Sequence, residues 1–162
     1  MPTIKHETSF EVDQPADVLF PLFSAEGEKL WVPGWDYENI MGTTDLHEDY
    51  IFLTSDHHAV HHHAPKTIWL VKRFEPSNHL VQFYRVEPED KVAIVTVHCK
   101  SITGEQTKVT VAYEFIGLSE KGNQFIKGYT AEDHEEFIGN WSGLLSAYFE
   151  TGPKNMHTGR SH

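Results

Sequence analysis

Histidines are concentrated in one stretch of the 162-residue sequence, where five of them stand within seven positions. The segment reads Asp56, His57, His58, Ala59, Val60, His61, His62, His63. Neutral imidazole is a common ligand for zinc, nickel and copper. On an extended segment His61 and His63 share a face, and a hairpin brings His57 across to them, with Asp56 available as a fourth ligand. This pattern defines a candidate zinc or nickel site at His57, His61 and His63. The alternative, which we favour, is a solvated loop with incidental metal affinity.

Aromatic side chains form a second group with functional potential, since they make up 12% of the chain. Such side chains either fill a core or line a ligand cavity, in which Trp N–H and Tyr O–H groups orient the ligand. We expect a cavity. Its predicted lining comprises Trp31, Trp35, Trp69, Phe83, Tyr113, Phe137, Trp141 and the neighbouring Leu145.

Two histidines, His6 and His98, fall on strand segments that are otherwise apolar on alternate positions. A buried histidine can polarise a ligand carbonyl or act as an acid or base, so both join the predicted cavity. The simpler interpretation, which we favour, is a histidine hydrogen-bonded to a threonine or a backbone group. The sequence shows no Ser–His–Asp order, glycine-rich phosphate loop or Cys–His pair of useful spacing, so it identifies no catalytic residue.

The charge balance narrows the range of partners. Lys and Arg number 13 and Asp and Glu number 24, which gives a formal net charge of −11. Such a chain repels phosphate backbones and anionic membrane surfaces. Cys99 is the only cysteine, the first residues lack the apolar run of a signal peptide, and no segment approaches the roughly 18 apolar residues of a membrane span. We expect a soluble cytoplasmic protein that is a monomer or a homodimer.

Two kinds of periodicity indicate the elements that position these residues. Residues 4–12 and 107–117 alternate between apolar and polar, which predicts half-buried strands. Further strands are expected at 37–42, 50–54, 67–74, 79–86 and 92–101, joined by short turns as in an antiparallel meander. Short helices are predicted at 16–23 and 27–31. A long helix is predicted at 130–149, with Thr130 as its N-cap and an apolar stripe of Phe137, Trp141, Leu144, Leu145 and Tyr148.

Three stretches carry a family resemblance. Residues 10–20 read FEVDQPADVLF, residues 28–35 read EKLWVPGW, and residues 67–71 read TIWLV with FEP at 74–76. They resemble the START-like (SRPBCC, polyketide cyclase/dehydrase-related) superfamily. The resemblance implies an α+β helix-grip fold. In that fold a curved antiparallel sheet of about seven strands wraps around a long C-terminal helix, two short helices follow the first strand, and a cavity lies between. We expect one such domain at 1–152 and a flexible tail at 153–162.

Three functions are compatible with these features. The first is the binding or carrying of a small apolar or amphipathic molecule, which needs only a cavity. The second is a cyclase- or dehydratase-like enzyme for an aromatic or polyketide-type substrate, which also needs an ionisable group such as His6, His98 or Tyr113 with a perturbed pKa. The third is a regulatory protein-interaction module, which needs an exposed apolar patch. We predict the first, with no cofactor other than the zinc or nickel considered above.

Overall fold

The computed structural model of the protein describes residues 3–55 and 66–151. Its strands are β1 (Thr3–Val12), β2 (Ile51–Thr54), β3 (Thr67–Glu75), β4 (Leu80–Glu87), β5 (Lys91–Thr103) and β6 (Gln106–Gly117). Its helices are α1 (Ala16–Leu19), α2 (Glu120–Gly128) and α3 (Ala131–Thr151), with 3-10 turns η1 (Phe20–Phe23), η2 (Gly27–Leu30) and η3 (Pro76–Asn78). The element order matches the predicted order closely.

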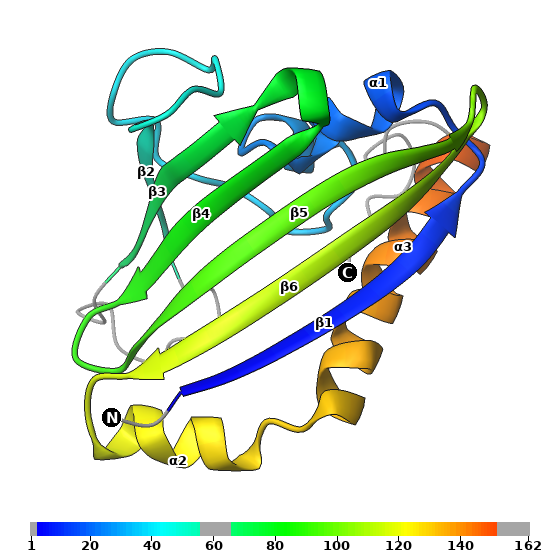
Figure 1. Ribbon diagram of the computed structural model, residues 1–162. Helices are drawn as coiled ribbons and strands as arrows, with labels where there is room; N and C mark the ends of the chain where they lie inside the picture. The colour runs from blue at the N-terminus through cyan, green and yellow to red at the C-terminus, as the bar shows by residue number, and fades with distance from the viewer. Residues whose placement is uncertain (1–2, 56–65, 152–162) are drawn as a thin grey trace.

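The strands of the described residues form one curved antiparallel sheet in the order β1-β6-β5-β4-β3-β2 (Figure 1). Alternation decides which face of each strand is buried, because successive side chains point to opposite sides. On β5 the buried positions are Lys91, Ala93, Val95, Val97 and Cys99, and the residues between them face outward. A bulge between Val71 and Arg73 shifts the β3–β4 register and adds to the bend of the sheet.

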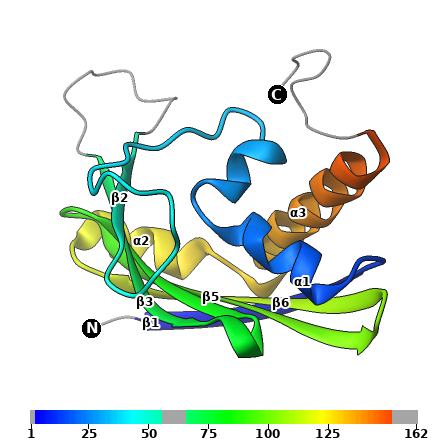
Figure 2. The ribbon, with the colours of Figure 1, turned by 90° about the horizontal axis from the view of Figure 1, so that it is seen from above.

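All three α-helices lie on the same side of the sheet, together with the segment that joins η2 to β2 (Figure 2). The hydrophobic core lies between them and the concave face, and includes Leu19, Phe23, Trp31, Val71 and Leu145. An antiparallel sheet with one apolar face requires such a cover. The helix-grip architecture predicted from the sequence is therefore confirmed.

The long helix α3 begins with the predicted cap. The Thr130 side chain accepts a hydrogen bond from the Asp133 amide (3.1 Å), and the Asp133 carboxylate accepts one from the Thr130 amide (3.0 Å). Four residues of the predicted apolar stripe lie in the core or pack against it: Trp141, Leu144, Leu145 and Tyr148. The prediction did not include His134 and Ile138, which are also buried. Phe137 is 39% exposed; it lines a cavity, and its ring meets the Tyr113 ring of β6 edge-on at 5.5 Å between centres.

Two features correct the prediction. The sheet has six strands among the described residues, because the strand expected at 37–42 is reduced to a single bridge between Glu38 and Leu53. Helix α2 was not predicted, because its two glycines read as turn residues. It begins at the Ser119 N-cap, and Gly122 allows close contact, since a Cβ there would lie 1.8 Å from the Asp90 carbonyl oxygen.

Two predicted features fall on residues 56–65 and 152–162, outside the described residues. They are the histidine-rich segment with His57, His61 and His63, and the C-terminal tail. Within residues 3–55 and 66–151, no helix is long and apolar enough to cross a membrane.

Candidate ligand-binding pocket

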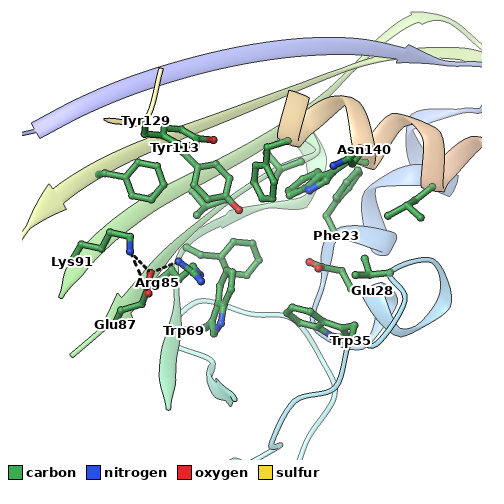
Figure 3. Close-up of a pocket in the computed structure, with 18 of the residues that line it drawn as sticks. Phe23, Glu28, Trp35, Trp69, Arg85, Glu87, Lys91, Tyr113, Tyr129 and Asn140 are labelled. Carbon is green, nitrogen blue, oxygen red and sulfur yellow. Dashed lines mark hydrogen bonds and ion pairs between the residues drawn. The ribbon is translucent and has the colours of Figure 1, made fainter. Parts of the chain in front are cut away.

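A pocket of about 610 Å³ lies between the concave face of the sheet, α3 and the segment around η2 (Figure 3). Its lining is mainly apolar and aromatic, with a few polar side chains. The apolar lining comprises Phe23, Val32, Trp35, Trp69, Phe83, Val95, Val97, Tyr113, Phe115, Phe125, Tyr129, Phe137, Trp141 and Leu144. The polar lining comprises Glu28, Arg85, Glu87, Lys91 and Asn140. Volumes of 300–1,000 Å³ with few polar groups are typical of small-molecule sites.

The strand register places the sheet residues of the pocket in parallel rows. One row runs Trp69, Arg85, Ala93 and Phe115, and the next runs Val71, Phe83, Val95 and Tyr113. Ala93 is buried between Arg85 and Phe115, and its side chain is a single methyl group, much smaller than those of its two neighbours in the row.

The end of the pocket near the β4–β5 turn carries charge. Arg85 Nη1 donates to Glu87 Oε2 at 2.5 Å, and Lys91 Nζ lies 3.3 Å from the same oxygen. The Arg85 guanidinium lies 5.5 Å from the centre of the Trp69 ring, and Lys91 Nζ lies 4.1 Å from the centre of the Phe125 ring. These contacts hold two cations against one lining carboxylate, in surroundings where aromatic faces replace much of the water.

Glu28 occupies another part of the wall and has different surroundings. Figure 3 shows its carboxyl pointing into the cavity near Phe23 and Trp35. Burial raises the pKa of Glu28 from 4.5 to about 8, and no hydrogen bond or ion pair to its carboxyl is found within the described part of the chain. At pH 7 a pKa of 8 leaves about ten neutral carboxyls for each ionised one, so Glu28 is a hydrogen-bond donor there.

Tyr113 presents its hydroxyl to the same space (Figure 3). Burial, opposed by the Arg85 charge and reinforced by Glu28, raises the pKa of Tyr113, so its phenol is neutral at physiological pH. The charges of Arg85 and Glu28 are therefore close enough to Tyr113 to influence its ionisation. The Tyr113 hydroxyl has no protein hydrogen-bond partner among residues 3–55 and 66–151.

Tyr129 differs because its hydroxyl is already engaged. His134 Nε2 lies 3.1 Å from the Val111 carbonyl oxygen, which can only accept, so Nε2 carries the proton. The other ring nitrogen, Nδ1, therefore accepts the O–H of Tyr129 at 2.9 Å. Burial lowers the pKa of His134 and raises that of Tyr129 to about 12, so both stay neutral. Tyr129 consequently offers the pocket an oxygen lone pair and not a proton.

The structure brings six of the predicted cavity residues together around the pocket: Trp35, Trp69, Phe83, Tyr113, Phe137 and Trp141. Four lie elsewhere. Trp31 is buried in the core, where its indole N–H donates to the Leu22 carbonyl at 2.8 Å, and Leu145 is buried on the sheet side of α3. His98 is on the outward face of β5. His6 donates from Nε2 to the Tyr129 carbonyl (3.1 Å), which is the backbone hydrogen bond favoured for it above.

The sequence prediction missed the charged lining residues, although strand parity carried a signal for most of them. Arg85 and Glu87 continue the series of Val81 and Phe83, and Lys91 begins the series of Ala93 and Val95 on β5. A charged residue two positions along a strand from a buried apolar residue points to the same side of the sheet, and therefore toward the interior. Glu28 offered no such signal, because it stands in a single 3-10 turn without periodicity.

Among residues 3–55 and 66–151 no group of three or more His, Cys, Asp or Glu side chains could hold a metal ion. The candidate zinc or nickel ligands His57, His61 and His63 lie outside those ranges and stay a prediction.

No family model and no curated protein matches the sequence. Several solved structures match the fold. Norcoclaurine synthase from Thalictrum flavum, in complex with dopamine and hydroxybenzaldehyde, is 13% identical over 93% of this chain and 88% of its own, with a TM-score of 0.66. Ara h 8.0201 is 12% identical over 90% and 95%, with a TM-score of 0.61. The Zhui aromatase/cyclase from Streptomyces sp. R1128 is 14% identical over 90% and 86%, with a TM-score of 0.54.

These likenesses extend over almost the whole chain, and at such low identity they establish the fold alone. They agree with the resemblance to the START-like (SRPBCC) superfamily drawn from residues 10–20, 28–35 and 67–76.

Proposed function

We propose that the protein binds a small apolar or amphipathic molecule in the pocket between its sheet and α3. The observation that carries the proposal is the cavity of about 610 Å³ with aromatic walls on both sides. Filling that space with well-packed side chains would stabilise the fold, so a cavity of this size is a feature that needs a function. Norcoclaurine synthase was solved with two small aromatic compounds on the same fold, which adds support by analogy.

A pair of substitutions on one strand tests the proposal. Val95 is buried and lines the pocket, whereas its neighbour Ile94 points to the outer face of β5. We expect the wild type to bind 1-anilinonaphthalene-8-sulfonate saturably while folded. Val95→Trp should fill the pocket and abolish saturable binding, and Ile94→Trp should leave it unchanged. Equal dye binding by both variants would show that the dye sits elsewhere and would refute the proposal.

A second candidate function is a cyclase- or dehydratase-like reaction in the same pocket, and the observation that favours it is Glu28. A neutral carboxylic acid can donate a proton to a ligand oxygen, and its carboxylate can then take a proton from the ligand carbon framework. Both steps occur when a hydroxylated ring precursor loses water. The discriminating experiment is Glu28→Gln, which should abolish turnover of such a substrate and leave its affinity within a few-fold. Retained turnover would exclude Glu28 as the acid.

The proposal assigns no metal to the pocket. Zinc or nickel binding by His57, His61 and His63 is a separate proposal, for which the spacing in the sequence is the support.

A further inference from the structure

We propose that the pocket selects ligands bearing a carboxylate, which the guanidinium of Arg85 binds at the charged end of the cavity. This inference rests on the proposed function, because it names the class of ligand that the same pocket takes. Three observations carry it: the unused donors of Arg85, the local excess of positive charge, and the second donor supplied by Tyr113.

Arg85 has more donors than the protein satisfies. A guanidinium carries five N–H groups in a planar fork, and the described residues accept from one of them, at Glu87. The Arg85 guanidinium carbon lies 5.5 Å from the centre of the Trp69 ring, so an aromatic wall borders the group while its other N–H groups stay available to a ligand. An edge with two parallel N–H groups matches the two oxygens of a carboxylate.

The charges around Arg85 favour an anion. The cluster that lines this end of the pocket sets two cations, Arg85 and Lys91, against one carboxylate, Glu87, at 2.5 and 3.3 Å; Asp90 and the exposed Lys121, which pair at 3.5 Å, lie outside the lining. It therefore keeps one positive charge, in a chain whose formal net charge is −11. A ligand carboxylate would complete the neutralisation, whereas a ligand ammonium would add to the excess.

The Tyr113 hydroxyl faces the same part of the pocket as the Arg85 guanidinium (Figure 3). It has no acceptor among the described side chains and so can donate to a ligand oxygen. Aromatic rings surround these donors, because Trp69 and Phe83 lie on the sheet and Phe137 lies opposite on α3. The pocket thus combines donors for an anionic head with flat apolar walls for a ring system.

The rival assignment makes Glu28 the anchor, with an amine as the ligand. Its carboxyl also lacks a protein partner among the described residues, and an ammonium would pair with it once ionised. The cost of that ionisation in an apolar wall weakens the pairing, whereas binding to a guanidinium requires no change of charge. The charge state therefore favours the Arg85 anchor, and the experiment below separates the two.

Three naphthalene compounds of matched shape test the inference by isothermal titration calorimetry: 2-naphthoate, 2-naphthamide and 2-naphthylmethylamine. We expect 2-naphthoate to bind the wild type at least about tenfold more tightly than the amide, since charge-assisted hydrogen bonds are roughly twice as strong as neutral ones. Arg85→Gln should remove that advantage, because it should weaken the binding of naphthoate more than the binding of naphthamide. Lys72→Gln makes the same charge change on an exposed residue whose ammonium lies over Tyr84, and it should have no effect.

Equal affinity for naphthoate and naphthamide, or tightest binding of the amine, would overturn the inference. If all three compounds still displace the dye, the proposed function stands and the carboxylate preference alone falls. If the folded wild type binds neither the dye nor any of the three, both fall. The wild-type series decides the matter even where thermal melting shows that Arg85→Gln does not fold.

Discussion

Glu28 should make the protein less stable as the pH rises, and Glu28→Gln should remove that dependence. A carboxyl with a folded pKa of about 8 and an ordinary value of 4.5 binds more protons in the folded state than in the unfolded state between these limits. The folded state is therefore favoured at low pH, and the free energy of unfolding falls as the pH rises from 4.5 toward 8.

The magnitude follows from the difference between the two pKa values. Each pH unit in this window costs about 1.4 kcal/mol, so the loss at pH 7 is about 3 kcal/mol relative to pH 4.5. Water in the pocket screens the Glu28 charge and reduces this loss, so we expect the free energy of unfolding to fall by about 2–3 kcal/mol between pH 4.5 and pH 7. The uncharged glutamine side chain of the variant carries no such cost, so the variant should be more stable than the wild type at pH 7.

Urea unfolding at pH 5, 6, 7 and 8 measures the effect. The difference in unfolding free energy between Glu28→Gln and the wild type should grow with pH and vanish near pH 4.5. Glu105→Gln removes the same charge in an exposed turn, so its difference should stay within about 0.5 kcal/mol at every pH. A Glu28→Gln variant that is less stable at pH 7, or whose difference does not change with pH, would refute the reasoning.

Three further predictions concern the frame around the pocket and the histidine-rich segment. Trp141→Ala should lower the free energy of unfolding by about 3 kcal/mol in urea, because Trp141 packs on Phe23 and Trp31 at 6.0 and 5.9 Å between ring centres. Thr130→Ala should cost about 1 kcal/mol in the same assay, since it removes the α3 cap; a change below about 0.3 kcal/mol would contradict the capping role. Zinc titrated into the full chain should bind weakly and leave the melting temperature unchanged; one tight site, lost when the five histidines of residues 57–63 become serine, would make metal part of the function.

The sequence predicted most of the strands and the long helix, because the spacing of apolar residues along the chain matches the spacing of buried positions in each element. Thr107, Val109, Val111, Tyr113 and Phe115 alternate along β6, and all five are buried as that alternation requires. The α3 cap was also predictable, since threonine followed three residues later by an acid satisfies free amides locally. Both features depend on neighbours along the chain, which a sequence displays directly.

Tertiary packing, and not the local sequence, decides which side of α3 is buried and which polar side chains reach the pocket. Apolar residues cover more than one side of α3, so the pattern alone could not decide that Ile138 is fully buried whereas Phe137 lines the pocket and stays 39% exposed. Glu28 reaches the pocket only because the chain after α1 folds back over the sheet (Figure 2). Helix α2 forms for the same kind of reason: Ile126 is buried, and α2 contacts β6.

Binding inside the pocket is the central claim, and a nuclear magnetic resonance titration tests it most directly. With ¹⁵N-labelled protein and 2-naphthoate, we predict saturable shifts of the Trp69 indole and of the Arg85, Val95 and Tyr113 amides, which surround the cavity. The Lys72 amide, on the exposed bulge of β3, should not move. Shifts confined to the outer face of the sheet, or shifts that never saturate while the protein stays folded, would contradict the account.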